Sequence, residues 1–278
     1  MMWAAASLAL KWSNKPLLLV FPPILFHTAM NSAGGLLENI GRNMRQLFRS
    51  PVCWALVALT GAIHLLTEWL GGPGQRPMLG WYFEFGLSRE GIFGGAFWSL
   101  LTYGLLHGSW WHWGMNALFL LLIGSRIEFV AGPAVLVRAL IFGVLGGALG
   151  HLLLAPDNGV AQVLVGLSGG CMALLLVLTT LSPESRMMPL PISARSLGLG
   201  LIVASLLLSL ANLTLSLPAF SDLGKSLATH GLGDLFKMGH ACHLGGALAG
   251  WLYGRWLLRQ RISLERLRTA RMRREASK

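Results

Sequence analysis

The chain has 278 residues, of which 54% are hydrophobic and only 12% are charged, and its mean hydropathy is +0.60. Soluble domains carry about 25% charged residues, so this composition argues against an ordinary soluble domain and predicts an integral membrane protein. The formal net charge is +11. We interpret it as membrane topology and attraction to anionic lipid, and expect no nucleic-acid partner, since no nucleic-acid-binding module accompanies it.

Residues 1–45 precede the first clear apolar stretch. Two lysines and the pair Pro22-Pro23 interrupt their apolar run, and no signal peptide with a cleavage site is visible. We predict an N-terminal extension that is either membrane-associated or the product of a start assigned too early. Met44 is the alternative start.

Six stretches of the chain contain no Asp, Glu, Lys or Arg. They cover residues 50–67, 91–125, 139–156, 158–183, 196–221 and 238–254. A helix needs about 20 apolar residues to cross the hydrocarbon core, and all but one of the stretches have roughly that length. The exception, 91–125, is too long for one helix, so part of it must do something else. We predict an all-α membrane bundle of six spans over residues 46–256, followed by a basic tail at 257–278.

The basic residues predict which way the bundle faces. If both termini are cytoplasmic, all but four of the 22 Lys and Arg residues lie on the cytoplasmic side. The four exceptions are Arg76, Arg89, Lys225 and Lys237. This asymmetry follows the positive-inside rule, so we expect a multi-pass protein of a bacterial inner (plasma) membrane with both ends inside. The basic tail is expected to lie on anionic lipid of the inner leaflet.

Three sets of polar residues fall inside predicted spans, where polar side chains are costly and mark candidate sites. The second span holds "HGSWWHWGMN", which places His107, His112 and Asn116 in the order H-x4-H-x3-N. The fourth span opens with Ser168 in G-x-S-G, and the sixth carries His243 in "HACHLGG". At about 1.5 Å of rise per residue, Asn116, Ser168 and His243 all lie roughly 15–24 Å above the inner end of their spans. The sequence therefore predicts that an amide, a hydroxyl and an imidazole meet between helices.

These residue types suit nucleophilic catalysis. A serine hydroxyl becomes a nucleophile when a base within hydrogen-bond reach takes its proton, and histidine is the usual base. No Asp or Glu lies at the depth of Ser168 and His243, so a dyad is favoured over a triad. Asparagine amides, histidine N–H groups and backbone amides can bind the oxyanion that forms. Four glycines beside these residues would let helix backbones approach closely: Gly166, Gly169, Gly246 and Gly250.

The three motifs, in this order and in these spans, resemble the signature of the rhomboid family of intramembrane serine proteases. The resemblance covers roughly residues 50–256. It implies that Ser168 is the nucleophile and His243 the general base. It also implies that His112, Asn116 and the backbone N–H of Ser168 form the oxyanion hole.

The same resemblance implies roles for the remaining residues. His107 would support a water-accessible cavity, and the four glycines would match the family's motif glycines. Part of 91–125 would be a first loop lying in the outer leaflet, and Glu128 would match the acidic residue after the second span. No cofactor or metal is implied. The expected partners are transmembrane protein substrates and the lipid bilayer.

The chain departs from the family pattern at three places. Ser99 follows Trp98 where many members have arginine, Met172 replaces an aromatic residue that stacks on the base, and Cys242 replaces the alanine before the base. These differences suggest a divergent branch. A rhombosortase-like member, which trims C-terminal membrane anchors of exported proteins, is one candidate branch.

Other interpretations stay open from the sequence. A catalytically silent rhomboid-like protein would bind membrane helices for quality control, and a small transporter would use the polar cluster as its pathway. A transporter would predict inverted repeats or intramembrane carboxylates, and neither is visible. Asn116 can also join helices without catalysis. His240 and His243 form an H-x2-H pair without the further ligands of a metal site, and His64, near the end of the first span, has no predicted role.

Overall fold

The computed structural model describes residues 47–71, 76–155, 163–185, 192–212, 215, 217–233 and 239–259, together with 272 and 275. The chain divides into two compact units, 1–45 and 46–278. The predicted N-terminal extension and nearly all of the basic tail lie outside the described residues. The domain boundaries proposed from the sequence therefore stay predictions. The helices and the candidate site all belong to the second unit.

Helices make up 81% of the described part of the chain, which contains no strand. The longer elements are α2 (Pro51–Trp69), α3 (Arg76–Phe85), α6 (Trp110–Phe119), α8 (Pro133–Leu154), α9 (Ser168–Leu181), α10 (Ala194–Leu210) and α12 (His240–Leu258). The shorter elements are α4 (Arg89–Phe93), α5 (Ser99–Thr102), η1 (Tyr103–Leu105), η2 (Leu120–Gly124), α7 (Ser125–Ala131), α11 (Phe220–Leu227) and η4 (Ala228–Leu232). The predicted all-α rhomboid-like membrane fold is confirmed.

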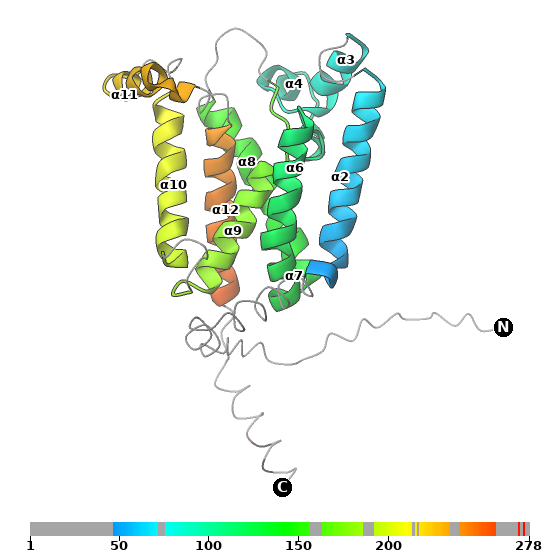
Figure 1. The fold of residues 1–278 in the computed structure, drawn as a ribbon, viewed down its shortest axis with the longest axis vertical. Helices are drawn as coiled ribbons and strands as arrows, with labels where there is room; N and C mark the ends of the chain where they lie inside the picture. The colour runs from blue at the N-terminus through cyan, green and yellow to red at the C-terminus, as the bar shows by residue number, and fades with distance from the viewer. Residues whose placement is uncertain are drawn as a thin grey trace, which may run out of the picture. The chain divides into compact units, whose positions relative to one another are not determined.

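Helices α2, α6, α8, α9, α10 and α12 run roughly along one direction, with α3, α4 and α11 at one end and α7 at the other (Figure 1). The π-helical turn η2 joins α6 to α7 without a break. Among the described residues, three helices are long and apolar enough to cross a membrane: 51–69, 110–131 and 133–154. Helices α9 and α10 are apolar but shorter. The count of six spans stays a prediction.

The long uncharged stretch 91–125 is divided as expected. It holds the end of α4, the short turns α5 and η1, and then α6, which begins only at Trp110. Within the uncharged stretch 158–183, α9 begins at Ser168, where the sequence predicts that the fourth span opens, and it has 14 residues. The described residues 163–167 before it are not helical, and Gly166 has a φ of 115°. Ser168 therefore lies at the start of a helix that is shorter than the uncharged stretch.

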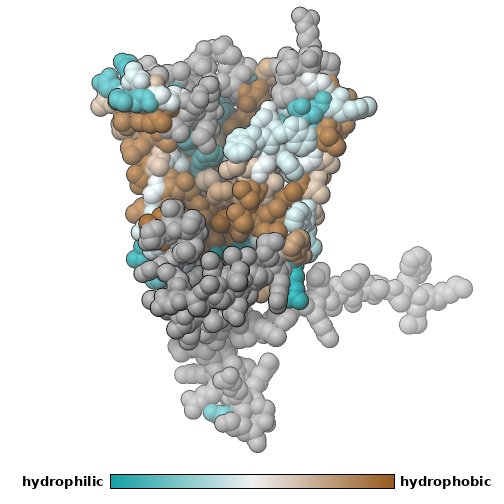
Figure 2. Space-filling model, viewed as in Figure 1, coloured by the Kyte–Doolittle hydropathy of each residue, from teal (hydrophilic) through white to brown (hydrophobic). Residues whose placement is uncertain are grey.

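The surface of the bundle is apolar, as a lipid-facing surface should be. Large apolar side chains stand exposed on several helices, including Trp69 (80% exposed), Leu153 (68%) and Leu199 (62%). Figure 2 shows hydrophobic residues across the middle of one face and hydrophilic ones mostly near its ends. The interior, by contrast, contains buried serines, threonines and histidines. This distribution fits a protein whose solvent is the bilayer.

Glycines let α12 lie directly against the backbone of α9. A Cβ atom at Gly246 would collide with the main chain of Gly169, and one at Gly250 would collide with the main chain of Ala173. Such small-residue contacts are how helices approach closely when both are surrounded by lipid. The same packing fixes the start of α9 beside the first turn of α12.

Helix α8 completes this close-packed group. A Cβ at Gly146 would lie 2.7 Å from the carbonyl oxygen of Gly245 on α12. A Cβ at Gly143 would lie 2.8 Å from the Cα of Gly170 on α9. Helices α8, α9 and α12 therefore form a core in which backbone meets backbone, and the site is built on two of its helices.

Candidate active site

Ser168 and His243 are in direct contact across α9 and α12. The Nε2 atom of His243 lies 3.0 Å from the Oγ atom of Ser168, and both side chains are partly buried. The Ser168 hydroxyl can donate to Nε2 when the imidazole carries its proton on Nδ1. The geometry is that of a serine beside its general base. The sequence expectation that a hydroxyl and an imidazole meet between helices agrees with this distance.

The loop before Ser168 is held by hydrogen bonds to the region between α3 and α6. Leu164 and Leu87 exchange main-chain hydrogen bonds of 2.8 and 3.0 Å, and the Gly166 N–H donates to the carbonyl of Tyr103 at 2.9 Å. A positive φ at Gly166 then turns the chain into α9, a conformation that glycine adopts without a steric penalty. These hydrogen bonds and the turn at Gly166 position Ser168 at the start of α9.

Helix α6 presents two polar side chains to the same loop. Ser109 caps α6 by accepting from the N–H of His112 at 3.1 Å, and Asn116 follows His112 by one turn. A Cβ at Gly166 would lie 2.5 Å from the Nε2 of His112 and 3.6 Å from the Nδ2 of Asn116. Both side chains therefore lie close over the backbone two residues before Ser168, and only glycine leaves space for them there.

Two donors near this point, the Asn116 amide and the Ser168 main-chain N–H, are available within the described part of the chain. The Nδ2 of Asn116 is buried and forms no hydrogen bond within the described part of the chain. As the first residue of α9, Ser168 has a main-chain N–H with no intrahelical acceptor. A helix start also carries partial positive charge. These donors are suited to an oxyanion, which is the role expected for His112, Asn116 and the Ser168 N–H.

His107 lies behind His112 and is 1% exposed. Its carbonyl oxygen accepts a hydrogen bond of 2.5 Å from the Tyr82 hydroxyl, and its ring centroid lies 5.2 Å from that of His112. Neither of its ring nitrogens makes a hydrogen bond to a described residue. The structure thus brings His107 into the cluster without giving it a contact to Ser168.

Two further residues belong to this region, although nothing in the sequence indicates a role for them. Tyr103 is fully buried, donates to the carbonyl of Val144 at 2.7 Å and lies 3.7 Å from the sulfur of Cys242. It therefore supports the segment just before His243. His64 is fully buried in α2, with its ring centroid 6.3 Å from that of His107.

Met172 and His240 are neighbours of the dyad along α9 and α12. Met172 is partly buried and packs against a cluster that includes Leu175 and Leu176. The His240 ring lies one turn before His243, with the two ring centroids 6.0 Å apart. Among the described residues no group of three or more His, Cys, Asp or Glu side chains is arranged to hold a metal ion.

Fold and site together define a helical membrane protein with a serine–histidine pair inside its bundle. Residues 94–260 match the Rhomboid domain, which is more than half of the chain. The chain belongs to the rhomboid family, which includes intramembrane serine proteases and inactive members. No curated protein sequence matches the chain. All of the predicted site residues lie within the matched region, whereas α2 with His64 precedes it.

Proposed function

We propose that this protein is an intramembrane serine endopeptidase that cleaves transmembrane or juxtamembrane segments of other membrane proteins with a Ser168–His243 dyad. The observation that carries the proposal is the 3.0 Å contact between Ser168 Oγ and His243 Nε2. Membership of the rhomboid family supports the same reaction class. In this proposal no cofactor takes part.

The acylation step uses both the Ser168–His243 dyad and the oxyanion donors. The Ser168 Oγ attacks the carbonyl carbon of the scissile peptide bond while its proton passes to His243 Nε2. The negative charge that develops on the carbonyl oxygen is met by the Asn116 amide, the His112 ring and the Ser168 N–H. His243 then gives its proton to the leaving amine, the C–N bond breaks, and an ester to Ser168 remains.

The deacylation step repeats the chemistry with water. A water molecule attacks the ester carbonyl and gives a proton to His243, and the same donors bind the oxyanion. Collapse of this intermediate returns the proton to Ser168 Oγ and releases the new carboxyl end. This scheme uses no carboxylate beside His243, and the glycine contacts hold α9 and α12, which carry the two side chains, backbone against backbone.

The substrate must be locally unwound, since a peptide bond within a regular helix is shielded by its own hydrogen bonds and side chains. Segments with small or helix-destabilising residues are therefore the proposed targets. We place the enzyme as a multi-pass protein of a bacterial inner membrane with cytoplasmic termini, as the distribution of Lys and Arg favours. Whether it belongs to a rhombosortase-like branch is a question of substrate preference.

The alternative function is a silent relative that binds membrane helices without cutting them. A silent protein has no need for a nucleophile and base held in contact, or for buried donors without partners. Those two features favour the enzyme. The two functions also differ in a way that a single experiment can measure.

The test is cleavage of a reporter helix by the purified full-length chain in proteoliposomes. The reporter carries a small-residue transmembrane segment with a fluorescent tag at each end, and products are separated by gel and sized by mass spectrometry. Wild type is expected to release two fragments, while Ser168→Ala and His243→Ala release none above background.

Ser205→Ala is the matched control, because Ser205 is a buried serine on α10 outside the dyad and the oxyanion donors. It is expected to cut like wild type. Folded wild type that binds the reporter but produces no more fragment than Ser168→Ala, over several small-residue reporters, would instead establish the helix-binding function.

A further inference from the structure

Four ring nitrogens are buried side by side between α2 and the start of α6. They are the Nδ1 and Nε2 atoms of His64 and of His107, and none makes a hydrogen bond to a described residue. Both side chains are at most 1% exposed. The rings lie near the carbonyls of His107 and Leu105, but these contacts lack hydrogen-bond geometry.

Such an arrangement is costly unless something else binds the nitrogens. A buried polar group without a partner destabilises a fold, and one such ring is unusual enough to need an explanation. Here two adjacent rings, His64 on α2 and His107 just before α6, both have nitrogens without a hydrogen-bond partner among the described residues. The usual resolution in protein interiors is an ordered water with two to four polar neighbours.

The ring separations fit a water-bridged chain. The His64 and His107 centroids are 6.3 Å apart, and those of His107 and His112 are 5.2 Å apart. A water that bridges two ring nitrogens holds them about 5 Å apart, which corresponds to ring centroids up to about 7 Å apart and so includes both separations. No direct hydrogen bond joins the nitrogens of His64 and His107. Three histidines would also suit a metal ion, but no group of three possible ligands in the described part of the chain has the geometry for one.

The surroundings hold this cluster rigidly on both sides. Trp110 at the start of α6 lies edge-on to His64, with ring centroids 4.5 Å apart. The Tyr82 hydroxyl fixes the backbone of His107, and the Trp113 indole N–H donates to Thr60 on α2 at 3.3 Å. Helix α2 therefore meets α6 through polar groups at the level of the histidines.

We propose that His64 is a positioning residue, which together with His107 binds water between α2 and α6 and through it holds the His112 ring in place over Gly166. The catalytic consequence rests on the proposed protease function, because His112 acts there as an oxyanion donor. Which ring nitrogen of a histidine carries the proton is set by the partner of the other nitrogen. A bound water chain on the far side of His112 supplies such a partner.

Two substitutions separate positioning from packing. His64→Phe keeps a ring of similar size but removes both nitrogens, whereas His64→Gln keeps a hydrogen-bonding group. The reaction of Ser168 with a fluorescent fluorophosphonate, the kcat and KM for a reporter helix, and the thermal midpoint are measured for the full chain in nanodiscs. We expect His64→Phe to lose about tenfold in labelling rate and in kcat with KM unchanged, as small misplacements of a catalytic group do.

The thermal midpoint of His64→Phe should equal or exceed that of wild type, because the substitution removes unpartnered polar atoms. His64→Gln should recover most of the rate. Tyr253→Phe is the matched control, since its buried hydroxyl also has no partner among the described residues and lies ten residues beyond His243, about 15 Å along α12. It should leave the rate unchanged. A folded His64→Phe that labels and cuts within twofold of wild type overturns the proposal.

A second measurement does not depend on activity. A crystal structure of the wild-type chain that resolves buried waters should show one within hydrogen-bond distance of both His64 and His107, and the His64→Phe structure should lack it. Rings in contact with no water between them would overturn the proposal even if every variant were active. If wild type labels no better than Ser168→Ala, the protease function fails while this structural result still stands by itself.

Discussion

The two halves of the candidate site are built in opposite ways. On the α9–α12 side, Ser168 and His243 contact each other directly, and the helices that carry them touch through glycines at Gly246 and Gly250. On the α2–α6 side, the Nδ2 of Asn116 and the ring nitrogens of His64 and His107 are buried and make no hydrogen bond to a described residue. One half of the site is close-packed, and the other holds buried polar atoms that no described residue pairs.

The difference follows from what each half must do. A general base has to stay at hydrogen-bond distance from its nucleophile, and backbone-to-backbone packing provides that rigidity. An oxyanion exists only during the reaction, so its donors must lack a partner in the resting protein. Unpartnered buried donors cost stability. The dyad is therefore positioned by close backbone packing, whereas the oxyanion side depends on donors that are left without a partner in the resting protein.

The largest effect is expected from Asn116→Ala on the oxyanion side. Removal of one oxyanion donor typically lowers kcat by about 10²–10³-fold, because the charge it would meet forms only in the transition state. KM should change little, and the thermal midpoint should not fall, since the Nδ2 atom has no partner among the described residues to lose. Steady-state kinetics on a reporter helix measure this split. A raised KM with unchanged kcat would contradict the assignment.

A smaller but clear effect is expected from Gly246→Ala on the close-packed side. The new Cβ would collide with the main chain of Gly169, so α12 must shift away from α9. Overpacking of this kind costs about 1–3 kcal/mol, and the dyad distance should lengthen with it. Thermal unfolding in detergent and the fluorophosphonate labelling rate should both fall.

Gly200→Ala is the matched control, because nothing lies within 4 Å of a Cβ at that position on α10. There the same change should stabilise the helix by about 0.5–1 kcal/mol. If Gly246→Ala and Gly200→Ala changed the thermal midpoint and the labelling rate equally, the close packing of α9 and α12 would not explain how the dyad is held.

Glu128→Gln should have a more modest effect, confined to stability. The Glu128 carboxylate accepts the N–H groups of Val52 and Cys53 at 3.1 and 3.0 Å, which caps the start of α2 from 75 residues away. The amide keeps one acceptor and loses the charge, so about 1–2 kcal/mol of stability should be lost. The labelling rate of the folded fraction should stay near that of wild type. A lower midpoint together with lost labelling would link this cap to the site.

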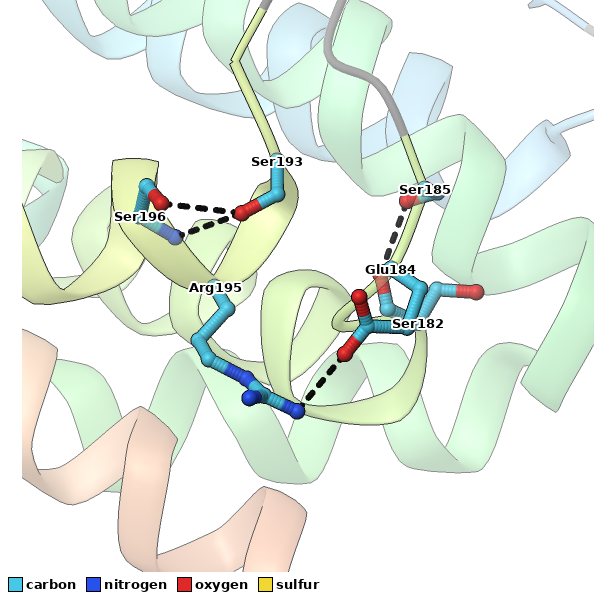
Figure 3. A network of polar contacts seen from close by, with 6 residues as sticks. All are labelled: Ser182, Glu184, Ser185, Ser193, Arg195 and Ser196. Atoms are coloured by element: carbon cyan, nitrogen blue, oxygen red, sulfur yellow. Dashed lines mark hydrogen bonds and ion pairs between the residues drawn. The ribbon is translucent and has the colours of Figure 1, made fainter.

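The smallest effect is expected where the chain leaves α9 and enters α10, and Figure 3 shows the Arg195 side chain at the start of α10 meeting Glu184. This ion pair spans 2.6 Å, but both side chains are more than two-thirds exposed. Exposed pairs contribute about 0–1 kcal/mol. Glu184→Gln should therefore leave the thermal midpoint almost unchanged and alter neither labelling nor cleavage. A large loss would mean that Glu184 stabilises the bundle by some other contact.

Much of the site can be predicted from sequence because its residues sit in short motifs on separate spans. Counting residues from the charged ends places Asn116, Ser168 and His243 at similar depth, and small residues beside them predict close helices. The opening of the fourth span at the G-x-S-G motif agrees with α9, which begins at Ser168. The non-helical path of residues 163–167 could not be predicted, because an uncharged loop and an uncharged helix look alike in composition.

The contacts that α2 makes to the site and to Glu128 could not be predicted from the sequence, for another reason. A single histidine near the end of an apolar stretch gives no periodic signal, so nothing indicates that His64 is buried beside His107. Glu128 was recognised by resemblance alone, and its partners at the start of α2 depend on how two distant helices pack. Long-range hydrogen bonds of this kind are set by tertiary structure rather than by local pattern.

The proposed mechanism depends above all on Ser168 being a nucleophile that His243 activates. The decisive experiment is the reaction of the membrane-embedded wild-type chain with a fluorophosphonate, followed by peptide mapping of the adduct. We predict a single adduct at Ser168, absent from Ser168→Ala and at least about a hundredfold slower to form in His243→Ala. Wild type that reacts no faster than Ser168→Ala, or an adduct at another serine, would contradict this mechanism.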